Sequence, residues 1–371
     1  MTPTELREMV PATENVAYFN TGASGPHTTR VLDAMAECQH AHGVESPAGE
    51  GMGMYAYAGA VHAEARSTAA AFVGANEDEI GLVPSTTDGI NVVADGIDWN
   101  EGDVVVKTDL EHPAGFLPWR RLRERWGIEV RTLETENGRL DLDEVAEAVE
   151  DARLICLSTI SWNYGTRLRI EEITELAHDA GTLVLADAVQ SVGQERIDVT
   201  EWGVDFLAGA SHKWLLGPWG AGFLYVDSDV LDDLRPGRVG ARSVVNPSGD
   251  GLEYEPSASR IELSTMAVTP YSGMIAAIET IEELGFDALQ SEVERLTDRL
   301  KANVDRPVMS PEQYESGLVS FEADDPDAVV ERLADEGIVI RSIPNPGCVR
   351  ASVHAFNSDE EIDALAEALS E

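Results

Sequence analysis

The sequence predicts an α/β fold, in which a doubly wound, mainly parallel sheet is joined to a smaller C-terminal α+β domain. In the middle of the chain, short apolar runs of strand length alternate with amphipathic segments whose outer faces are rich in carboxylates. This alternation is typical of parallel strands that are connected by covering helices. The alternation ends after Val226, and the length of 371 residues leaves room for a second domain.

The alternating segments of the large domain can be placed one by one. Three apolar runs are expected to be buried parallel strands, namely Asp103–Val106, Leu154–Leu157 and Leu183–Ala186. Amphipathic helices are expected in the intervals between these strands, over Pro118–Trp126, Leu142–Ala148 and Ile170–Ala180.

The C-terminal part of the chain has a different pattern. A loop rich in Gly, Ser and Pro, Arg235–Ser259, precedes one long helix that is expected from about Pro270 to Val304. A tail of strand, helix, strand, strand and helix follows and ends with Asp359–Leu369.

This change of pattern predicts two domains. The large domain is expected to span residues 16–245 and the small domain residues 246–371. The N-terminal segment, residues 1–15, is expected to pack on the small domain.

The charge of the chain excludes several classes of function. With 26 Lys and Arg against 68 Asp and Glu, the formal net charge is −42. Nucleic-acid binding needs a basic face, and an anionic membrane would repel this surface. A hydrophobic content of 43% excludes a disordered acidic tail. Lysine occurs only at Lys107, Lys213 and Lys301, which favours a halophilic, haloarchaeal protein over an ordinary acidic enzyme.

The sequence also indicates a soluble, cytoplasmic protein. No apolar run is as long as a membrane span, and residues 1–9 contain no apolar core of a signal peptide. Cys38, Cys156 and Cys348 are widely separated and odd in number. This spacing predicts neither a disulfide framework nor a metal site.

Reactive side chains follow two of the predicted strands. Asp187 comes directly after the run Leu183–Ala186, and Lys213 follows the run Val204–Ala208. In a doubly wound sheet, ligands bind at these carboxyl ends. Asp187 could instead cap a helix or form a structural ion pair, and Lys213 could be an ordinary loop lysine. The scarcity of lysine argues against the second alternative.

Polar residues also follow two other predicted strands. Ser85, Thr86 and Thr87 come after the run Ile80–Val83, just before a helix that is expected to start near Asp88. Hydroxyls and backbone N–H groups at a helix start can bind an anion, although one cap would explain one hydroxyl. His112 follows the valines that end at Val106 and, taken alone, is more often structural than functional.

Together these residues meet the needs of a pyridoxal 5′-phosphate (PLP) site. A carboxylate keeps the pyridine nitrogen protonated, a lysine forms a Schiff base, and a helix start with hydroxyls holds the phosphate. The combination of Asp187, Lys213, the hydroxyls and His112 is far more specific than any one of them.

The sequence resembles the class V aminotransferase family of fold-type I PLP enzymes, which includes cysteine desulfurases, cystine C–S lyases, isopenicillin-epimerase-like proteins and transaminases. The resemblance extends from Tyr18–Gly22 to the final helix, and its strongest motif is Ser211–Pro218, with the sequence Ser-His-Lys-Trp-Leu-Leu-Gly-Pro. It implies a fold-type I PLP-dependent transferase that acts on an amino acid.

The resemblance implies a role for each matching residue. Lys213 would form the internal aldimine and move the α-proton, Asp187 would pair with the pyridinium, and His112 would stack on the ring. Gln190 would hydrogen-bond the ring hydroxyl or the aldimine. The phosphate ligands would be Thr86, Thr87 and His212.

Two further implications concern the substrate and the assembly. Arg350 matches the arginine that binds the substrate carboxylate, and Asn20 is a second expected substrate-binding residue. Thr265 matches a phosphate ligand donated by the neighbouring subunit, which implies a homodimer with shared active sites.

The sequence departs from the family pattern at two places. Desulfurases have an asparagine where this chain has Trp162, and Asn163 lies one position away. The stretch Arg341–Gly347 is short and lacks the cysteine that a desulfurase uses. Cys348 would share a strand face with Arg350 but is expected to be a buried apolar residue.

These observations favour a PLP enzyme that acts on a free α-amino acid by C–S lyase or aminotransferase chemistry. The alternatives are a cysteine desulfurase that uses Cys348 and a cofactor-retaining, non-catalytic scaffold. A nicotinamide dehydrogenase is disfavoured because neither Gly22–Gly25 nor Gly217–Gly222 has the Gly-x-Gly-x-x-Gly spacing.

Overall fold

The largest element of the structure is a seven-stranded sheet with the order β2-β8-β7-β6-β5-β3-β4. The structure is a computed structural model that describes residues 1–48 and 53–370. Within the sheet, only β8 runs antiparallel to its neighbours, so the predicted mainly parallel sheet is confirmed. The strands are β2 (Ile80–Val83), β3 (Val104–Thr108), β4 (Glu129–Leu133), β5 (Ala152–Ser158), β6 (Leu183–Asp187), β7 (Phe206–Ala210) and β8 (Gly222–Val226).

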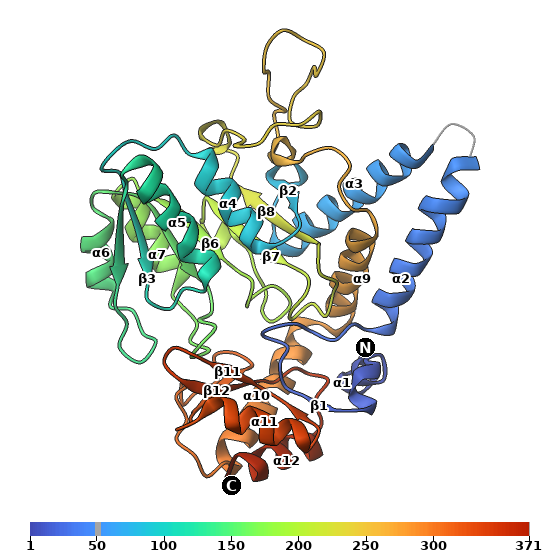
Figure 1. The fold of residues 1–371 in the computed structure, drawn as a ribbon, viewed down its shortest axis with the longest axis vertical. Helices are drawn as coiled ribbons and strands as arrows, with labels where there is room; N and C mark the ends of the chain where they lie inside the picture. Colours follow the sequence, from blue (N-terminus) through green and yellow to red (C-terminus); the bar gives the residue numbers. More distant parts are fainter. Residues whose placement is uncertain (49–52, 371) are drawn as a thin grey trace.

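Helices cover both faces of this sheet (Figure 1). Along β3, Val105 packs in the core under α4 and α5, whereas Val104 and Val106 pack in the core on the opposite face. Successive strand residues point to opposite faces, so both faces of the strand are buried. The covering helices are α4 (Thr86–Gly96) and α5 (Pro113–Trp126) on one face, and α3 (Gly53–Val73), α6 (Leu142–Val149), α7 (Ile170–Asp179) and α9 (Thr269–Leu284) on the other.

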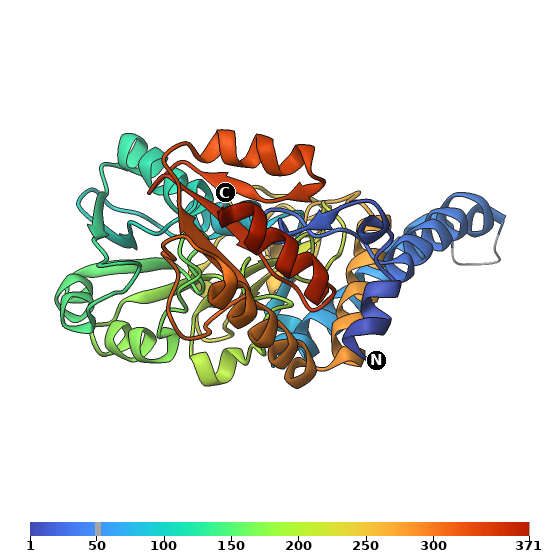
Figure 2. The ribbon, with the colours of Figure 1, turned by 90° about the horizontal axis from the view of Figure 1, so that it is seen from below.

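The C-terminal elements form a second group at one end of the molecule (Figures 1 and 2). A three-stranded antiparallel sheet has the order β11-β12-β9, and a short parallel pair joins β1 to β10. The elements are β1 (Ala17–Tyr18), β9 (Leu318–Glu322), β10 (Ile338–Val339), β11 (Arg341–Ile343), β12 (Cys348–Ser352), α10 (Phe286–Asn303), α11 (Pro326–Asp335) and α12 (Asp359–Ser370).

The remaining helices pack around these two groups of elements. Helix α2 (Thr29–His40) packs on α9, and α8 (Val199–Trp202) is a single turn before β7. Near the N-terminus, α1 (Pro3–Glu8) lies beside the C-terminal group, where the Arg7 guanidinium forms an ion pair with Glu361 of α12 at 2.8 Å.

The expected single helix from Pro270 to Val304 is wrong, because the chain forms two helices there. Gly285 adopts a φ of 80°, which ends α9, and α10 starts at the next residue. Helix α9 packs against α2 and α3 beside the large sheet, whereas α10 packs against α12. The division into two domains near residue 245 stays a prediction. Helix α9 belongs by residue number to the predicted small domain, but it packs beside the large sheet.

Two other expected elements differ in their bounds. The helix expected from Pro118 starts at Pro113, because the His112 side chain caps it and Pro118 is tolerated inside it. The helix expected near Asp88 starts at Thr86, after the cap residue Ser85. The C-terminal tail also contains one more short strand than expected, since β10 and β11 both precede β12.

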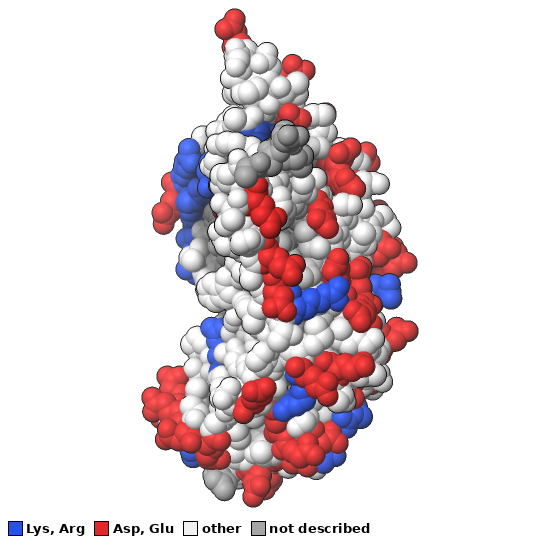
Figure 3. All heavy atoms as spheres, turned by 90° about the vertical axis from the view of Figure 1, so that its right-hand side faces the viewer, with Lys and Arg blue, Asp and Glu red and all other residues white. Residues whose placement is uncertain are grey.

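The surface agrees with the acidic composition. On the face shown in Figure 3, Asp and Glu side chains are spread over both groups of elements. Among the helices of the described residues, none combines the length and the apolar character that crossing a membrane requires.

Candidate active site

A cavity of about 150 Å³ lies at the carboxyl ends of β5, β6 and β7. The chain topology brings residues from distant parts of the sequence to this edge of the sheet. All of the predicted cofactor-binding residues except Thr265 line the cavity. The lining residues are Gly22, Ala23, Ser85, Thr86, Thr87, His112, Ala114, Trp162, Asp187, Val189, Gln190, His212, Lys213 and Arg341.

The loop after β7 places the Lys213 side chain in this cavity. The backbone N–H of Gly25 donates to the His212 carbonyl oxygen at 2.7 Å, and a Cβ at Gly25 would lie only 2.2 Å from the Lys213 carbonyl oxygen. Burial lowers the pKa of the Lys213 amine from 10.5 to about 7, although the Asp187 carboxylate acts in the opposite direction. Near neutral pH, much of this amine is therefore unprotonated and able to attack a carbonyl carbon.

Asp187 ends β6 and presents a buried carboxyl to the same cavity. Its Oδ1 accepts a hydrogen bond from the backbone N–H of Val189 at 3.1 Å. Burial raises the pKa of Asp187, and this hydrogen bond and the Lys213 charge only partly oppose the effect. A cationic group bound beside Asp187 would offset the cost of burying the carboxylate.

The start of α4 provides a set of hydroxyls at another side of the cavity. Ser85 is the cap residue, because its Oγ accepts from the Asp88 backbone N–H at 3.1 Å. The Oγ1 of Thr86 is buried and has no hydrogen-bond partner among the described residues. Thr86 therefore has a hydroxyl that the cap does not use, in a position where an anion would meet the helix start.

Two histidines of the cavity are neutral at neutral pH. Burial lowers the pKa of His112 to about 4, and it lowers the pKa of His212 to about 4 as well; the charge of Lys213 adds to both shifts. The His112 ring meets the Trp162 ring edge to face, with centroids 5.3 Å apart. An uncharged imidazole in this place can pack against a flat aromatic ligand without losing charge solvation.

Arg350 lies behind Gly22 and is fully buried. A Cβ at Gly22 would lie 2.9 Å from Nη2 of Arg350. One guanidinium nitrogen, Nη1, donates to the Trp162 carbonyl oxygen at 2.6 Å. Nε and Nη2 have no partner among the described residues, and neither do Oδ1 of Asn20 and Oγ of Ser352. Unpaired buried N–H groups of a cation are costly, so this place is built to receive an anion.

The sequence reasoning missed Arg341 as a site residue. Arg341 on β11 pairs directly with Arg350 on β12, and like charges in this position repel each other. The Arg341 guanidinium also lies 5.7 Å from the centre of the Trp162 ring and lines the cavity. The short interval between Arg341 and Arg350 suits a tight antiparallel hairpin, in which the two arginines would lie on neighbouring strands. This spacing is the sequence signal that could have identified Arg341.

Glu111 was also missed, although it stands next to His112 in the sequence. Its carboxylate is buried and accepts hydrogen bonds from Oγ1 of Thr108 at 2.6 Å and from Oγ of Ser158 at 2.8 Å. Burial raises the pKa of Glu111 to about 7, and the nearby Asp187 carboxylate adds to the effect. Glu111 thus ties the loop before α5 to the end of β5.

Five residues considered in the sequence do not line the cavity: Asn20 and Arg350, described above, and Thr265, Asn163 and Cys348. Thr265 is exposed, has a φ of 56°, and donates from Oγ1 to the Ser264 carbonyl oxygen. Asn163 is buried beside Trp162 but does not line the cavity. Cys348 is fully buried on β12, does not line the cavity, and has a pKa that burial raises.

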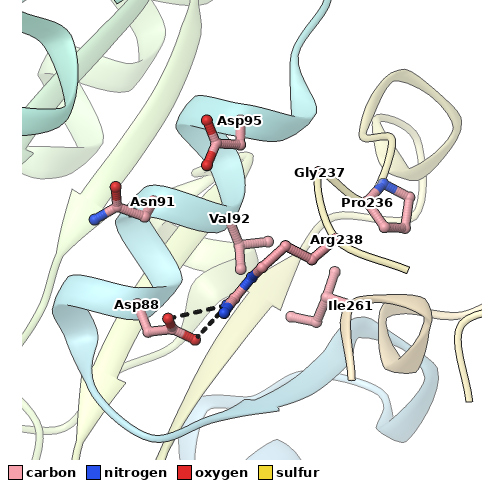
Figure 4. A pocket seen from close by; sticks show the side chains of 8 residues that line it. All are labelled: Asp88, Asn91, Val92, Asp95, Pro236, Gly237, Arg238 and Ile261. Carbon is pink, nitrogen blue, oxygen red and sulfur yellow. Dashed lines mark hydrogen bonds and ion pairs between the residues drawn. The ribbon is translucent and has the colours of Figure 1, made fainter. Parts of the chain in front are cut away.

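A second cavity, of about 270 Å³, lies along the exposed side of α4 (Figure 4). Its charged groups are already paired, since Arg238 binds Asp88 at 3.1 Å and Asp95 binds Arg121 at 2.7 Å. Among the described residues, none of the predicted site residues lines this cavity. The chemistry is therefore expected at the smaller cavity that contains Lys213.

Known proteins resemble this chain over almost its whole length. A family model described as aminotransferase class-V matches residues 17–365. A probable cysteine desulfurase of Methanothermobacter thermautotrophicus is 35% identical, over 99% of this chain and 97% of the relative. The apo structure of a cysteine desulfurase from Thermococcus onnurineus NA1 superposes with a TM-score of 0.93 at 29% identity, over 100% of this chain and 98% of the other.

A second similar structure carries the cofactor. It is a variant of C-DES with glycine covalently linked to PLP, with a TM-score of 0.91 at 27% identity, over 98% of this chain and 99% of the other. The same protein, a cystine C–S lyase, is also known in complex with its product cysteine persulfide. The family match over residues 17–365 and the similarity of the fold agree, and this chain belongs to the aminotransferase class-V family of PLP-dependent enzymes.

Proposed function

We propose that this enzyme cleaves the C–S bond of a free sulfur-containing α-amino acid, and that disulfide amino acids such as cystine are its preferred substrates. The observation that carries the proposal is the pair of residues Arg341 and Arg350, which are direct cross-strand partners on β11 and β12. Cystine has two carboxylates and could bind both arginines. Its sulfur leaves as a persulfide, so the reaction needs no enzyme thiol.

The residues around the cavity fit PLP. The free Oγ1 of Thr86 at the start of α4 suits the phosphate, with Thr87 and His212 as further ligands. The Asp187 carboxylate would hold a proton on the ring nitrogen, whose positive charge offsets the cost of burying that carboxylate. His112 would pack on one face of the ring. When bound, PLP supplies an electron sink for the pair left by removal of the α-proton.

Lys213 would both bind the cofactor carbonyl carbon and move the proton. Its pKa of about 7 leaves a neutral amine near physiological pH. That amine would take the proton from the α-carbon of the substrate and is expected to set the pH at which the reaction starts. Gln190 lines the cavity and would donate a hydrogen bond to the ring oxygen.

The substrate carboxylates would be bound by different arginines. Nε and Nη2 of Arg350, which have no partner among the described residues, would form a bidentate pair with the α-carboxylate, and Asn20 forms a backbone bridge with Ser352 of the same strand β12. Arg341 would bind the second carboxylate of a disulfide substrate. After C–S cleavage, water would hydrolyse the released enamine to pyruvate and ammonia, and the sulfur would leave as cysteine persulfide.

A second candidate function is cysteine desulfuration, because the 35% identical relative is named a probable cysteine desulfurase. That reaction needs an enzyme thiolate that reaches the substrate sulfur. Cys348 is fully buried in the middle sheet strand β12, and burial raises its pKa. Both properties argue against Cys348 as this thiolate.

We also propose that the enzyme is a homodimer in a salt-rich cytoplasm. Thr265 is exposed and remote from the cavity of its own chain, so it would reach the cavity of the partner. Exposed apolar side chains at the end of the protruding α2–α3 arm would lie against the partner (Figure 1), among them Val44, 61% exposed, and Tyr55, 81% exposed. The net charge of −42 needs strong screening.

One set of experiments tests the proposed reaction. The protein is purified in high salt with PLP, and its visible absorbance is recorded before and after borohydride. A visible band that persists in Lys213→Ala would refute the role of Lys213. Cystine, cysteine and non-sulfur amino acids are then compared; pyruvate with persulfide from cystine supports the proposal. Alanine with protein-bound persulfide would replace it by desulfuration, and a 2-oxo acid with aminated cofactor would replace it by transamination.

The assembly is tested by sedimentation across salt concentrations. A dimer at high KCl whose cofactor content falls in Thr265→Ala supports the shared site. A monomer that retains full PLP binding would refute it.

A further inference from the structure

Trp214 follows Lys213 in the sequence, and its ring is held by the C-terminal part of the chain. The side chain is fully buried and packs against Ile160 and Leu318. It stacks on His354, with ring centroids 6.0 Å apart and an interplanar angle of 18°. Nε2–H of His354 also donates to the Trp214 carbonyl oxygen at 3.0 Å, because a carbonyl oxygen can only accept. A Cβ at Gly317 would lie 2.8 Å from the indole ring, so the ring has little room to move.

The indole N–H of Trp214 points at a residue of the cofactor cavity. It donates to Oε1 of Gln190 at 2.7 Å. The other end of the same amide, Nε2 of Gln190, donates to the carbonyl oxygen of Gly22 at 3.1 Å. An indole N–H can only donate and a carbonyl oxygen can only accept, so both partners require the same orientation of the amide.

This orientation decides what Gln190 offers to a ligand in the cavity. The amide oxygen is engaged by Trp214, and one of the two hydrogens on Nε2 is engaged by Gly22. The second hydrogen on Nε2 is left for a ligand. Gln190 lines the cavity, so it presents a donor there and not an acceptor.

We propose that Trp214 is a positioning residue that keeps the Gln190 amide in its donor orientation toward the ring oxygen of PLP. The inference rests on the proposed binding of PLP at Lys213 and adds a residue that does not touch the cofactor cavity. A donor stabilises the negative charge on the ring oxygen. The stabilised oxygen then attracts less strongly the proton on the nitrogen that would join Lys213 to the cofactor. The hydrogen bond from Gln190 therefore lowers the pH at which this proton is lost.

The test is a double-mutant cycle on the PLP-loaded enzyme in constant high salt. The variants are Trp214→Phe, Gln190→Ala and the double variant, and the readout is the pH midpoint of the visible absorbance change. Trp214→Phe keeps an aromatic ring and removes the N–H. One lost hydrogen bond corresponds to a rise of the midpoint by about half a pH unit to one unit. In the Gln190→Ala background, the same substitution should leave the midpoint unchanged.

Trp119→Phe is the matched control, since Trp119 on α5 is also fully buried, in the core between α5 and the large sheet, and does not line the cavity. The Trp119→Phe substitution should lower the stability of the protein to urea and leave the pH midpoint of the absorbance change unaltered. An unchanged midpoint in Trp214→Phe, or an equal rise with and without Gln190, would overturn the role of Trp214 alone. A wild-type protein without a visible band would overturn the binding of PLP at Lys213 and this inference with it.

Discussion

The buried carboxyl of Glu111 offers a quantitative test of the electrostatics at this site. The substitution is Glu111→Gln, which keeps the shape of the side chain and removes its ionisation. The Gln oxygen can accept from Thr108 and from the Ser158 backbone N–H, as Oε1 of Glu111 does. The Ser158 hydroxyl donates to Oε2 of Glu111 and can instead accept from the Gln amide.

The size of the effect follows from the pKa of Glu111. Burial raises this pKa from 4.5 to about 7 in the folded protein. Because the folded value is the higher one, the favourable contribution of protonated Glu111 is complete below pH 4.5 and is lost as the pH rises through about 7. Each pH unit between the two values corresponds to about 1.4 kcal/mol, so wild type loses about 3 kcal/mol of stability over this range relative to Glu111→Gln.

The assay is urea unfolding of cofactor-free protein at constant KCl, followed by tryptophan fluorescence from pH 4.5 to pH 8.5. The difference in free energy of unfolding between Glu111→Gln and wild type should grow by about 3 kcal/mol toward high pH. Glu8→Gln, at an exposed carboxylate on α1, controls for the loss of one negative charge from this acidic protein. A difference that does not change with pH would refute the raised pKa and the burial argument behind it.

Three further predictions concern the reacting groups. Acylation of Lys213 in cofactor-free protein should rise with a midpoint near pH 7, as measured by mass spectrometry at each lysine; a midpoint near 10 would contradict its lowered pKa. Arg341→Met should raise KM for cystine roughly tenfold or more and leave KM for cysteine nearly unchanged. Arg350→Met should raise KM for both substrates. Equal effects of Arg341→Met on the two substrates would exclude the second carboxylate site. Cys348→Ser should leave persulfide formation from cystine unchanged, and its loss would assign the sulfur chemistry to Cys348 after all.

The sequence predicted well those parts of the site that follow a strand. Asp187 and Lys213 come directly after buried apolar runs, and a parallel sheet brings all such ends to one edge. The side chains at the start of α4 were found for the same reason. Local order along the chain is enough in these cases because the topology of the fold supplies the contact.

The residues that were missed depend on contacts between distant segments. Arg341 gains its meaning only from the register of β11 against β12, and a three-residue strand has no hydrophobic pattern from which to infer that register. Glu111 is noticed only when Ser158, from another strand, is seen to donate to it. The break at Gly285 was missed because a single glycine is tolerated inside many helices, and only its φ of 80° ends this one.

The three lysines show how the surface and the site of this protein are related. None of them is exposed in the structure, and burial lowers the pKa of each one. Nζ of Lys107 and Nζ of Lys301 donate to backbone carbonyl oxygens, of Thr108 at 3.1 Å and of Pro311 at 2.9 Å. Arginine carries the exposed cationic charge, and its guanidinium stays protonated and cannot form a Schiff base. Lys213 is half-buried and lines the cavity together with Asp187, and its amine donates to no such carbonyl oxygen among the described residues. Lys213 is therefore the lysine suited to chemistry.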